Sequence, residues 1–246
     1  MFMQRAPGIR CEDFQVFGER GSGTNFLTQF LRRNLKITFR SQYGWKHGIP
    51  VAVGYRHESL IAGIYRDPID WLVSLFQVPR TTYAAQVPDD FSQFIRSPFM
   101  GVTSHNDDDY WRDGTNATVP EDCPPQYLQL DRHPITGQPP ATPMHLRNFK
   151  LASLLGFKNR VNNLALIQYE HLKENRRAVI ERISTFYDLP ISGDFDPIEQ
   201  AAQPKNNFKG RPKMTRDQIS DADMAYILDR LDLERERALG YDYPEP

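Results

Sequence analysis

Two stretches of the chain, residues 13–76 and 163–189, alternate short apolar runs with helical hydrophobic patterns. The runs at Phe14–Phe17, Leu60–Tyr65 and Leu164–Glu170 have the length and composition of strands in a sheet core. Strands that alternate with helices are typical of a parallel sheet covered by helices. The pattern therefore predicts an α/β fold with a central parallel sheet.

Each predicted strand is followed by a predicted helix. The apolar residues at helical spacing are Phe26, Leu27, Phe30 and Leu31 after the first strand, Ile69, Trp71, Leu72, Leu75 and Phe76 after the second, and Ala178, Ile180, Ile183 and Phe186 after the third. Near the end of the chain, residues 215–239 predict one long amphipathic helix, and Gly240 is its expected C-terminal stop.

Residues 78–142 interrupt this pattern, because they are rich in Pro, Asp, Thr and Gln and have weak periodicity. Unstructured loops of this length are uncommon in compact domains, so we interpret the segment as an inserted, mostly helical or irregular cap on the substrate side. Helices are predicted at residues 91–95 and 144–155. With 246 residues, 39% of them hydrophobic, the chain can bury one substantial core, and we predict a single domain, 1–246.

The composition narrows the expected partners. Thirty Lys and Arg oppose 31 Asp and Glu, so the formal charge of -1 creates no overall attraction to nucleic acid or to a membrane surface. We see no signal-peptide core and no apolar run of about 18 residues, which predicts a cytoplasmic protein. Cys11 and Cys123 lie far apart, and no spacing of His and Asp matches a chelate, so neither a disulfide nor a metal is predicted.

The first candidate site is the glycine-rich segment between the first strand and its helix. Glycines allow close approach of the backbone, and successive amides at a helix N-terminus attract an anion. A kinase-type phosphate loop would have Lys after its final glycine, but Gly23 is followed by Thr24 and Asn25. The segment therefore predicts a phosphate loop without the ATP-binding lysine. Arg20, Ser22, Thr24 and Asn25 add donors to the glycines of this segment, which include Gly21.

The second candidate site follows the second strand. Arg66 stands at the carboxyl end of that strand, where open parallel sheets bind their ligands. Asp67 suits the N-cap of the next helix and Pro68 its first position. Ser74 comes eight residues after Arg66, so a guanidinium and a hydroxyl could converge on one phosphate. An ion pair between Arg66 and Asp70 is the alternative.

Residues that could perform group transfer lie between these two loops. Transfer of a phosphoryl or sulfuryl group requires in-line positioning, neutralisation of charge and a base for the acceptor proton. His47 could be the base, because imidazole titrates near neutral pH, while Lys46 or Arg20 could stabilise the transferring group. Glu19, in the first loop, is the rival base.

Several of these segments resemble motifs of the sulfotransferases that use 3′-phosphoadenosine-5′-phosphosulfate (PAPS). Residues 22–27, Ser-Gly-Thr-Asn-Phe-Leu, resemble the family's 5′-phosphosulfate loop, although the preceding cation, Arg20, stands one position earlier than in the family. Residues 66–76 are similar to the 3′-phosphate motif in residue types and in the spacing from Arg to Ser. Residues 45–50 look like the Lys-Thr-His-x-Pro stretch, with Lys and His adjacent.

The resemblance continues in the second half of the chain. Residues 169–173, Tyr-Glu-His-Leu-Lys, resemble a segment whose tyrosine lies near the adenine, and residues 205–211 loosely match a basic loop that closes over the 3′-phosphate. The cofactor-binding residues that the resemblance implies are Arg20, Gly21, Ser22, Gly23, Thr24, Asn25, Arg66, Ser74, Tyr169, Lys209, Gly210 and Arg211.

The resemblance implies a three-layer fold like that of P-loop nucleotide-binding proteins. It also implies in-line transfer of a sulfuryl group from PAPS, as co-substrate, to a hydroxyl or amine of a small-molecule or carbohydrate acceptor. Tyr83, Trp111 and Tyr127 of the insertion suit sugars, phenols and peptides alike, so the acceptor stays open, as does the oligomeric state. Two other functions also stay open: a small-molecule or nucleotide kinase with an atypical phosphate loop, and a non-catalytic nucleotide-binding module.

Overall fold

The structure is a computed structural model that describes residues 1–50, 52–77, 88–99, 101–103, 128–198 and 213–244. The chain divides into two compact units. The first contains residues 1–66 and 154–207, and the second contains residues 67–153 and 208–246. The predicted insertion, 78–142, falls in the second unit.

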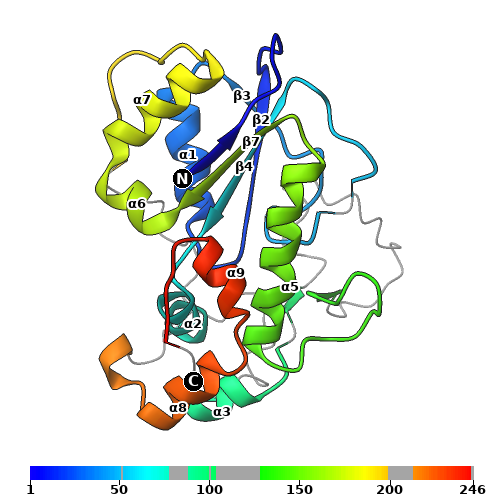
Figure 1. Ribbon diagram of the computed structural model, residues 1–246, viewed down its shortest axis with the longest axis vertical. Helices are drawn as coiled ribbons and strands as arrows, with labels where there is room; N and C mark the ends of the chain where they lie inside the picture. The colour runs from blue at the N-terminus through cyan, green and yellow to red at the C-terminus, as the bar shows by residue number, and fades with distance from the viewer. Residues whose placement is uncertain (51, 78–87, 100, 104–127, 199–212, 245–246) are drawn as a thin grey trace. The chain divides into compact units, whose positions relative to one another are not determined.

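The first unit is an α/β unit built on a five-stranded sheet (Figure 1). Its strand order is β1-β7-β4-β2-β3, in which β7, β4, β2 and β3 are parallel and β1 is antiparallel to β7. The strands are β1 (Phe2–Gln4), β2 (Asp13–Gly18), β3 (Thr38–Phe39), β4 (Ser59–Tyr65) and β7 (Asn163–Gln168). The predicted α/β class and the largely parallel sheet are confirmed, and the architecture is compatible with a three-layer α/β fold.

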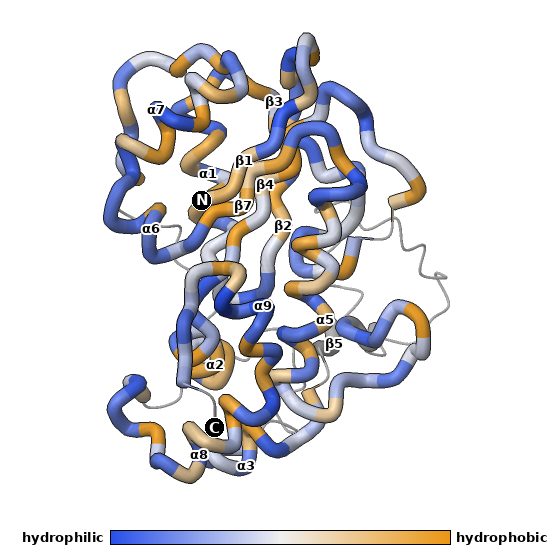
Figure 2. Tube along the Cα trace, in the orientation of Figure 1, coloured by the Kyte–Doolittle hydropathy of each residue, from blue (hydrophilic) through white to orange (hydrophobic). Residues whose placement is uncertain are grey.

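The strands are buried along most of their length, and alternate residues such as Phe14 and Val16 of β2 belong to one apolar core cluster. Figure 2 shows the apolar colour along the sheet. One face of the sheet packs against helices α1 (Thr24–Asn34), α6 (Tyr169–Glu174) and α7 (Arg176–Tyr187), which lie together on one side of it in Figure 1. On the opposite face, the ring of Phe17 lies 5.2 Å from that of Phe157, in the short 3-10 helix Gly156–Asn159.

The apolar pattern predicted the buried face of α1 more closely than that of α7. The four apolar positions expected of α1 are all buried. In α7 the buried residues are Val179, Ile180, Ile183 and Tyr187, whereas Ala178 is exposed and Phe186 is 37% exposed. The inward face of α7 is therefore turned slightly from the predicted one.

The third predicted strand, which is β7, ends earlier than predicted. Tyr169 and Glu170 were expected in the strand but are the first residues of α6. The last pair between β7 and β4 is Gln168 with Tyr65, at which β4 itself ends. Beyond this point the backbone has no strand to pair with in β4, so it turns into a helix instead.

The second unit contains helices around its own apolar core. They are α2 (Pro68–Gln77), α3 (Phe91–Arg96), α5 (Pro143–Leu155, which ends in the first unit), α8 (Asp221–Leu228) and α9 (Leu233–Ala238), with a 3-10 turn at Arg216–Gln218 and a small antiparallel pair, β5 (Gly101–Thr103) and β6 (Leu128–Leu130). The predicted helices at 68–76, 91–95 and 144–155 are confirmed. The pair β5–β6 was not predicted.

The single helix predicted over residues 215–239 is wrong, because the segment forms the 3-10 turn, α8 and α9. The Ser220 side chain accepts a hydrogen bond from the Asp223 amide, and the Asp232 side chain accepts one from the Arg235 amide. These side chains start new helices, which local capping favours over a continuous one. Gly240, with φ 93°, follows α9 as the predicted stop.

Candidate functional site

The predicted site residues of the first unit gather at one edge of its sheet. In the sheet register Gly18 of β2 pairs with Ile64 of β4, and Tyr65 pairs with Gln168 of β7, so the carboxyl ends of these parallel neighbours are level. The glycine-rich loop, Arg66 and Tyr169 each follow one of these ends. This is the edge at which open parallel sheets bind ligands.

The glycine-rich loop is held by its own hydrogen bonds. The amide and the hydroxyl of Ser22 both donate to the Glu19 carbonyl, over 3.2 Å and 2.6 Å. The Gly18 amide donates to the Lys46 carbonyl over 2.9 Å. Ser22 is fully buried. Its hydroxyl therefore stabilises the turn in this structure, and an anion would receive its hydrogen bonds from other groups of the loop.

Gly23 connects the loop to α1. It is the N-cap of α1 with φ 96° and ψ 20°, a left-handed conformation that favours glycine, and it provides no side-chain cap. The first helical hydrogen bond runs from the Leu27 amide to the Gly23 carbonyl. The amides of residues 24–26 therefore have no acceptor within the helix, and the first turn contains no carboxylate to compete with an anion. Thr24 is buried and Asn25 is exposed.

Arg20 supplies a cation within this loop. Its side chain is buried, and its guanidinium lies 5.2 Å from the ring of Trp45. A guanidinium packed on an aromatic ring keeps its N–H groups in its own plane, where they can reach an oxyanion. Trp45 was not predicted as a site residue. The sequence signal was an aromatic residue beside the predicted Lys46 and His47, but nothing in the sequence paired it with Arg20.

His47 lies against the same loop. Its Nδ1 is 2.9 Å from the Gly18 carbonyl oxygen, and its ring meets the Trp45 ring edge-on at 5.4 Å. Because a carbonyl only accepts, Nδ1 carries the proton, and Nε2 is the basic nitrogen of the neutral ring. Lys46 and His47 are both half-buried. Glu19, the rival base, is 3% exposed and is therefore more deeply buried than His47.

Arg66 reaches the glycine-rich loop from the neighbouring strand. Its Nη1 donates to the Gly21 carbonyl over 3.2 Å, and its guanidinium lies 5.1 Å from the ring of Tyr169. Three separate segments of the chain thus meet here: the loop after β2, the end of β4 and the start of α6.

The remaining predicted ligands lie elsewhere in the chain. Ser74 is half-buried on α2, in the second unit, so its approach to Arg66 stays a prediction. The predicted helix start is confirmed, since α2 begins at Pro68 and the Asp67 carboxylate accepts from the amides of Ile69 and Asp70 over 2.9 Å and 3.0 Å. Some predicted residues lie outside the described residues: Lys209, Gly210 and Arg211 of the basic loop, and Tyr83, Trp111 and Tyr127 of the insertion.

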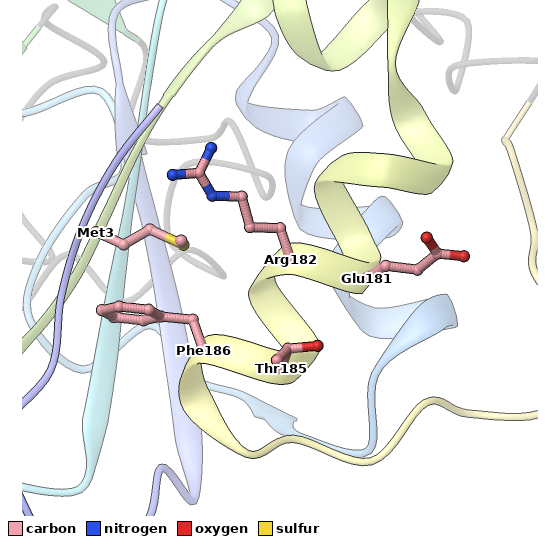
Figure 3. Close-up of a pocket in the computed structure, with 5 residues that line it drawn as sticks. All are labelled: Met3, Glu181, Arg182, Thr185 and Phe186. Atoms are coloured by element: carbon pink, nitrogen blue, oxygen red, sulfur yellow. The ribbon is translucent and has the colours of Figure 1, made fainter.

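A surface hollow of about 440 Å³ lies beside the edge strand β1 (Figure 3). It is lined by Met3 of β1 and by Glu181, Arg182, Thr185 and Phe186 of α7. None of the predicted site residues lines it, and its lining comes from neither the glycine-rich loop nor the residues after β4. The hollow is therefore separate from the candidate site.

Within the described residues, no group of three or more His, Cys, Asp or Glu could hold a metal ion. None of the helices in the described ranges has both the length and the apolar character to cross a bilayer. None of the protein-family models, curated proteins or solved structures compared with the chain matches it.

Proposed function

We propose that this chain is a sulfotransferase that binds PAPS at the carboxyl edge of the β2, β4 and β7 strands. The 5′-phosphosulfate would lie on the first-turn amides of α1, with Arg20 beside it, and the 3′-phosphate would lie on Arg66. The observation that carries the proposal is the contact of Arg66 with Gly21 and Tyr169, because it brings a second cation from the next strand onto the first phosphate loop.

The proposed reaction gives each of these side chains a role. Nε2 of His47 would remove the proton from the acceptor hydroxyl or amine as its oxygen or nitrogen forms a bond to sulfur. The bond from sulfur to the 5′-phosphate oxygen breaks at the same time, and adenosine 3′,5′-bisphosphate departs with the electron pair. Arg20 or Lys46 would neutralise charge on the transferring group and on the leaving phosphate.

The kinase alternative has weaker support. The residue after Gly23 is Thr24, which is buried in the first turn of α1, so the loop offers no lysine at the position where ATP-binding loops have one. A preference for a ligand phosphorylated at the 3′ position also separates the two functions, because ATP lacks that phosphate.

Isothermal titration calorimetry with adenosine 3′,5′-bisphosphate, adenosine 5′-monophosphate (AMP) and ATP tests the proposal. We expect the bisphosphate to bind most tightly, and Arg66→Ala to reduce its preference over AMP by roughly tenfold or more, the usual value of a lost charged hydrogen bond. Arg56→Ala is the matched control, because Arg56 pairs with Asp13 and Glu12 at the amino end of the sheet. Tighter binding of ATP would favour a kinase, and no nucleotide binding would refute the site.

Transfer itself requires a second assay, in which 35S-labelled PAPS is incubated with a panel of phenols, sugars and peptides. We expect label on one acceptor class and release of the bisphosphate. Tight binding of the bisphosphate with no transfer to any acceptor would identify the chain as a nucleotide-binding module instead.

A further inference from the structure

Tyr169 occupies a position between the two proposed phosphate sites. It is the first residue of α6, directly after β7, and its side chain is half-buried. Its ring lies 5.1 Å from the guanidinium carbon of Arg66. The same ring lies over Gly23, where an added Cβ would be only 2.6 Å from Cδ2 and 2.8 Å from Cε2 of Tyr169.

These contacts pack Gly23, Tyr169 and Arg66 against one another. The ring of Tyr169 rests on the N-cap of α1, which has no side chain to separate them, and the Arg66 guanidinium rests on the ring. Arg66 also donates to the Gly21 carbonyl of the same loop. The contact with the aromatic ring and the hydrogen bond to the carbonyl together restrict the orientations that the guanidinium can adopt.

From this geometry we infer that Tyr169 is a positioning residue that determines specificity for a 3′-phosphorylated nucleotide by orienting Arg66. The inference rests on the proposed function, and it differs from a role for Tyr169 in contacting the adenine. An adenine contact would serve every adenine nucleotide equally. A positioning role would serve only the ligand whose phosphate Arg66 receives, since the ring acts through the guanidinium.

Calorimetry on Tyr169→Phe and Tyr169→Leu separates these roles through the ratio of the affinity for adenosine 3′,5′-bisphosphate to that for AMP. Phenylalanine keeps the ring, so we expect the ratio to stay within about twofold of the wild-type value, whereas leucine should lower it by about five- to tenfold, the usual strength of a partly buried cation–π contact. An unchanged ratio in the leucine variant would overturn the inference. If both affinities fell equally, the result would indicate an adenine contact, and if neither fell, it would indicate no role for Tyr169 in nucleotide binding.

A double-mutant cycle with Arg66 excludes a merely structural effect. In an Arg66→Ala background, Tyr169→Leu should change the ratio no further, because the group on which it acts is gone. An additive loss would contradict the inference. Phe39→Leu is the matched control, since Phe39 lies 5.7 Å from the guanidinium of Arg32 in the same unit but on β3, which pairs with the amino end of β2.

Different results would refute the proposed function and the inference about Tyr169. If the wild-type chain bound the bisphosphate no better than AMP, both proposals would fall together. If the wild-type chain showed the preference and Tyr169→Leu kept it, only the inference about Tyr169 would fall.

Discussion

The orientation of His47 decides which of its nitrogens can act as a base. Its Nδ1–H donates to the carbonyl of Gly18, at the start of the loop proposed to hold the phosphosulfate, which leaves Nε2 as the basic nitrogen of the neutral ring. Glu19 is more deeply buried. The ring orientation of His47 and the burial of Glu19 thus favour His47 as the base. Both residues are substituted in the experiment that follows.

Removal of the base should lower the rate of transfer. We expect His47→Ala to reduce kcat with labelled PAPS by about 10²- to 10⁴-fold, the usual contribution of a general base. Glu19→Gln should keep more of the activity, and His57→Ala, just before β4, is the control that should leave kcat unchanged. A large loss in Glu19→Gln with full activity in His47→Ala would reverse the assignment.

The residue types of the site could be read from the sequence, but their contacts could not. The glycine-rich loop and Arg66 were predicted because each follows an apolar strand, a local pattern. The packing of Arg20 on Trp45 and of Arg66 on Tyr169 depends on which strands are neighbours and in what register. That information is not local, so no pattern in one segment contains it.

At the scale of elements, the start of α2 illustrates how much a short motif specifies. Asp67 caps α2 through the amides of Ile69 and Asp70, and its carboxylate also accepts from the Tyr243 hydroxyl and from Arg216 at 3.4 Å. The cap was predicted from Asp before Pro. The contacts with Tyr243 and Arg216 were not, because they come from residues distant in the sequence.

Loss of this cap should destabilise the protein measurably. We expect Asp67→Ala to lower the free energy of unfolding, measured with urea, by about 1 kcal/mol for the cap and by more in total because Tyr243 also loses its partner. Asp90→Ala, which removes only the cap of α3, is the matched control. Equal losses in the two variants would contradict a role for Asp67 beyond capping.

A buried ion pair joins α5 and α9 within the second unit. The guanidinium of Arg147 donates from Nε and Nη2 to the two carboxylate oxygens of Glu236, over 2.5 Å and 2.8 Å, and both side chains are at most 1% exposed. The predicted continuous helix over 215–239 gave no indication of this pair, because a charged residue at a helical position is ordinarily read as solvent-facing.

Replacing one residue of this pair should lower the free energy of unfolding more than replacing both. We expect Arg147→Met alone to lower the free energy of unfolding by about 3–5 kcal/mol, since it leaves a buried carboxylate without its cation, and Arg147→Met with Glu236→Leu to recover much of that loss. Urea unfolding of the two single variants and the double variant measures the difference. A double variant as unstable as the sum of the single ones would contradict a coupled pair.

At the scale of the whole molecule, burial of acidic groups predicts the response to alkaline pH. Burial raises the pKa of the Cys11 thiol from 9.0 to about 11, and burial followed by the charge of Glu170 raises that of Tyr65 from 10.0 to about 12. The pKa of Tyr187 is raised in the same direction, chiefly by burial. In the unfolded chain these groups have their ordinary pKa values, so they lose their protons at a lower pH than in the folded chain.

Stability should therefore fall as the pH rises above about 9, because the unfolded state then binds fewer protons than the folded state. The contribution of Cys11 is fully present below pH 9 and is lost as the pH rises towards 11. Urea unfolding at pH 8, 9 and 10 should show a decreasing free energy, with a shallower decrease in Cys11→Ala. A free energy that is constant or rises over this range would contradict the account.

The most direct measurement of the proposed site is a crystal structure of the chain with adenosine 3′,5′-bisphosphate. We expect the 5′-phosphate on the amides at the start of α1 and the 3′-phosphate within hydrogen-bond distance of the Arg66 guanidinium. A nucleotide bound with its phosphates exchanged, or bound in the hollow beside β1 instead, would contradict the proposed site.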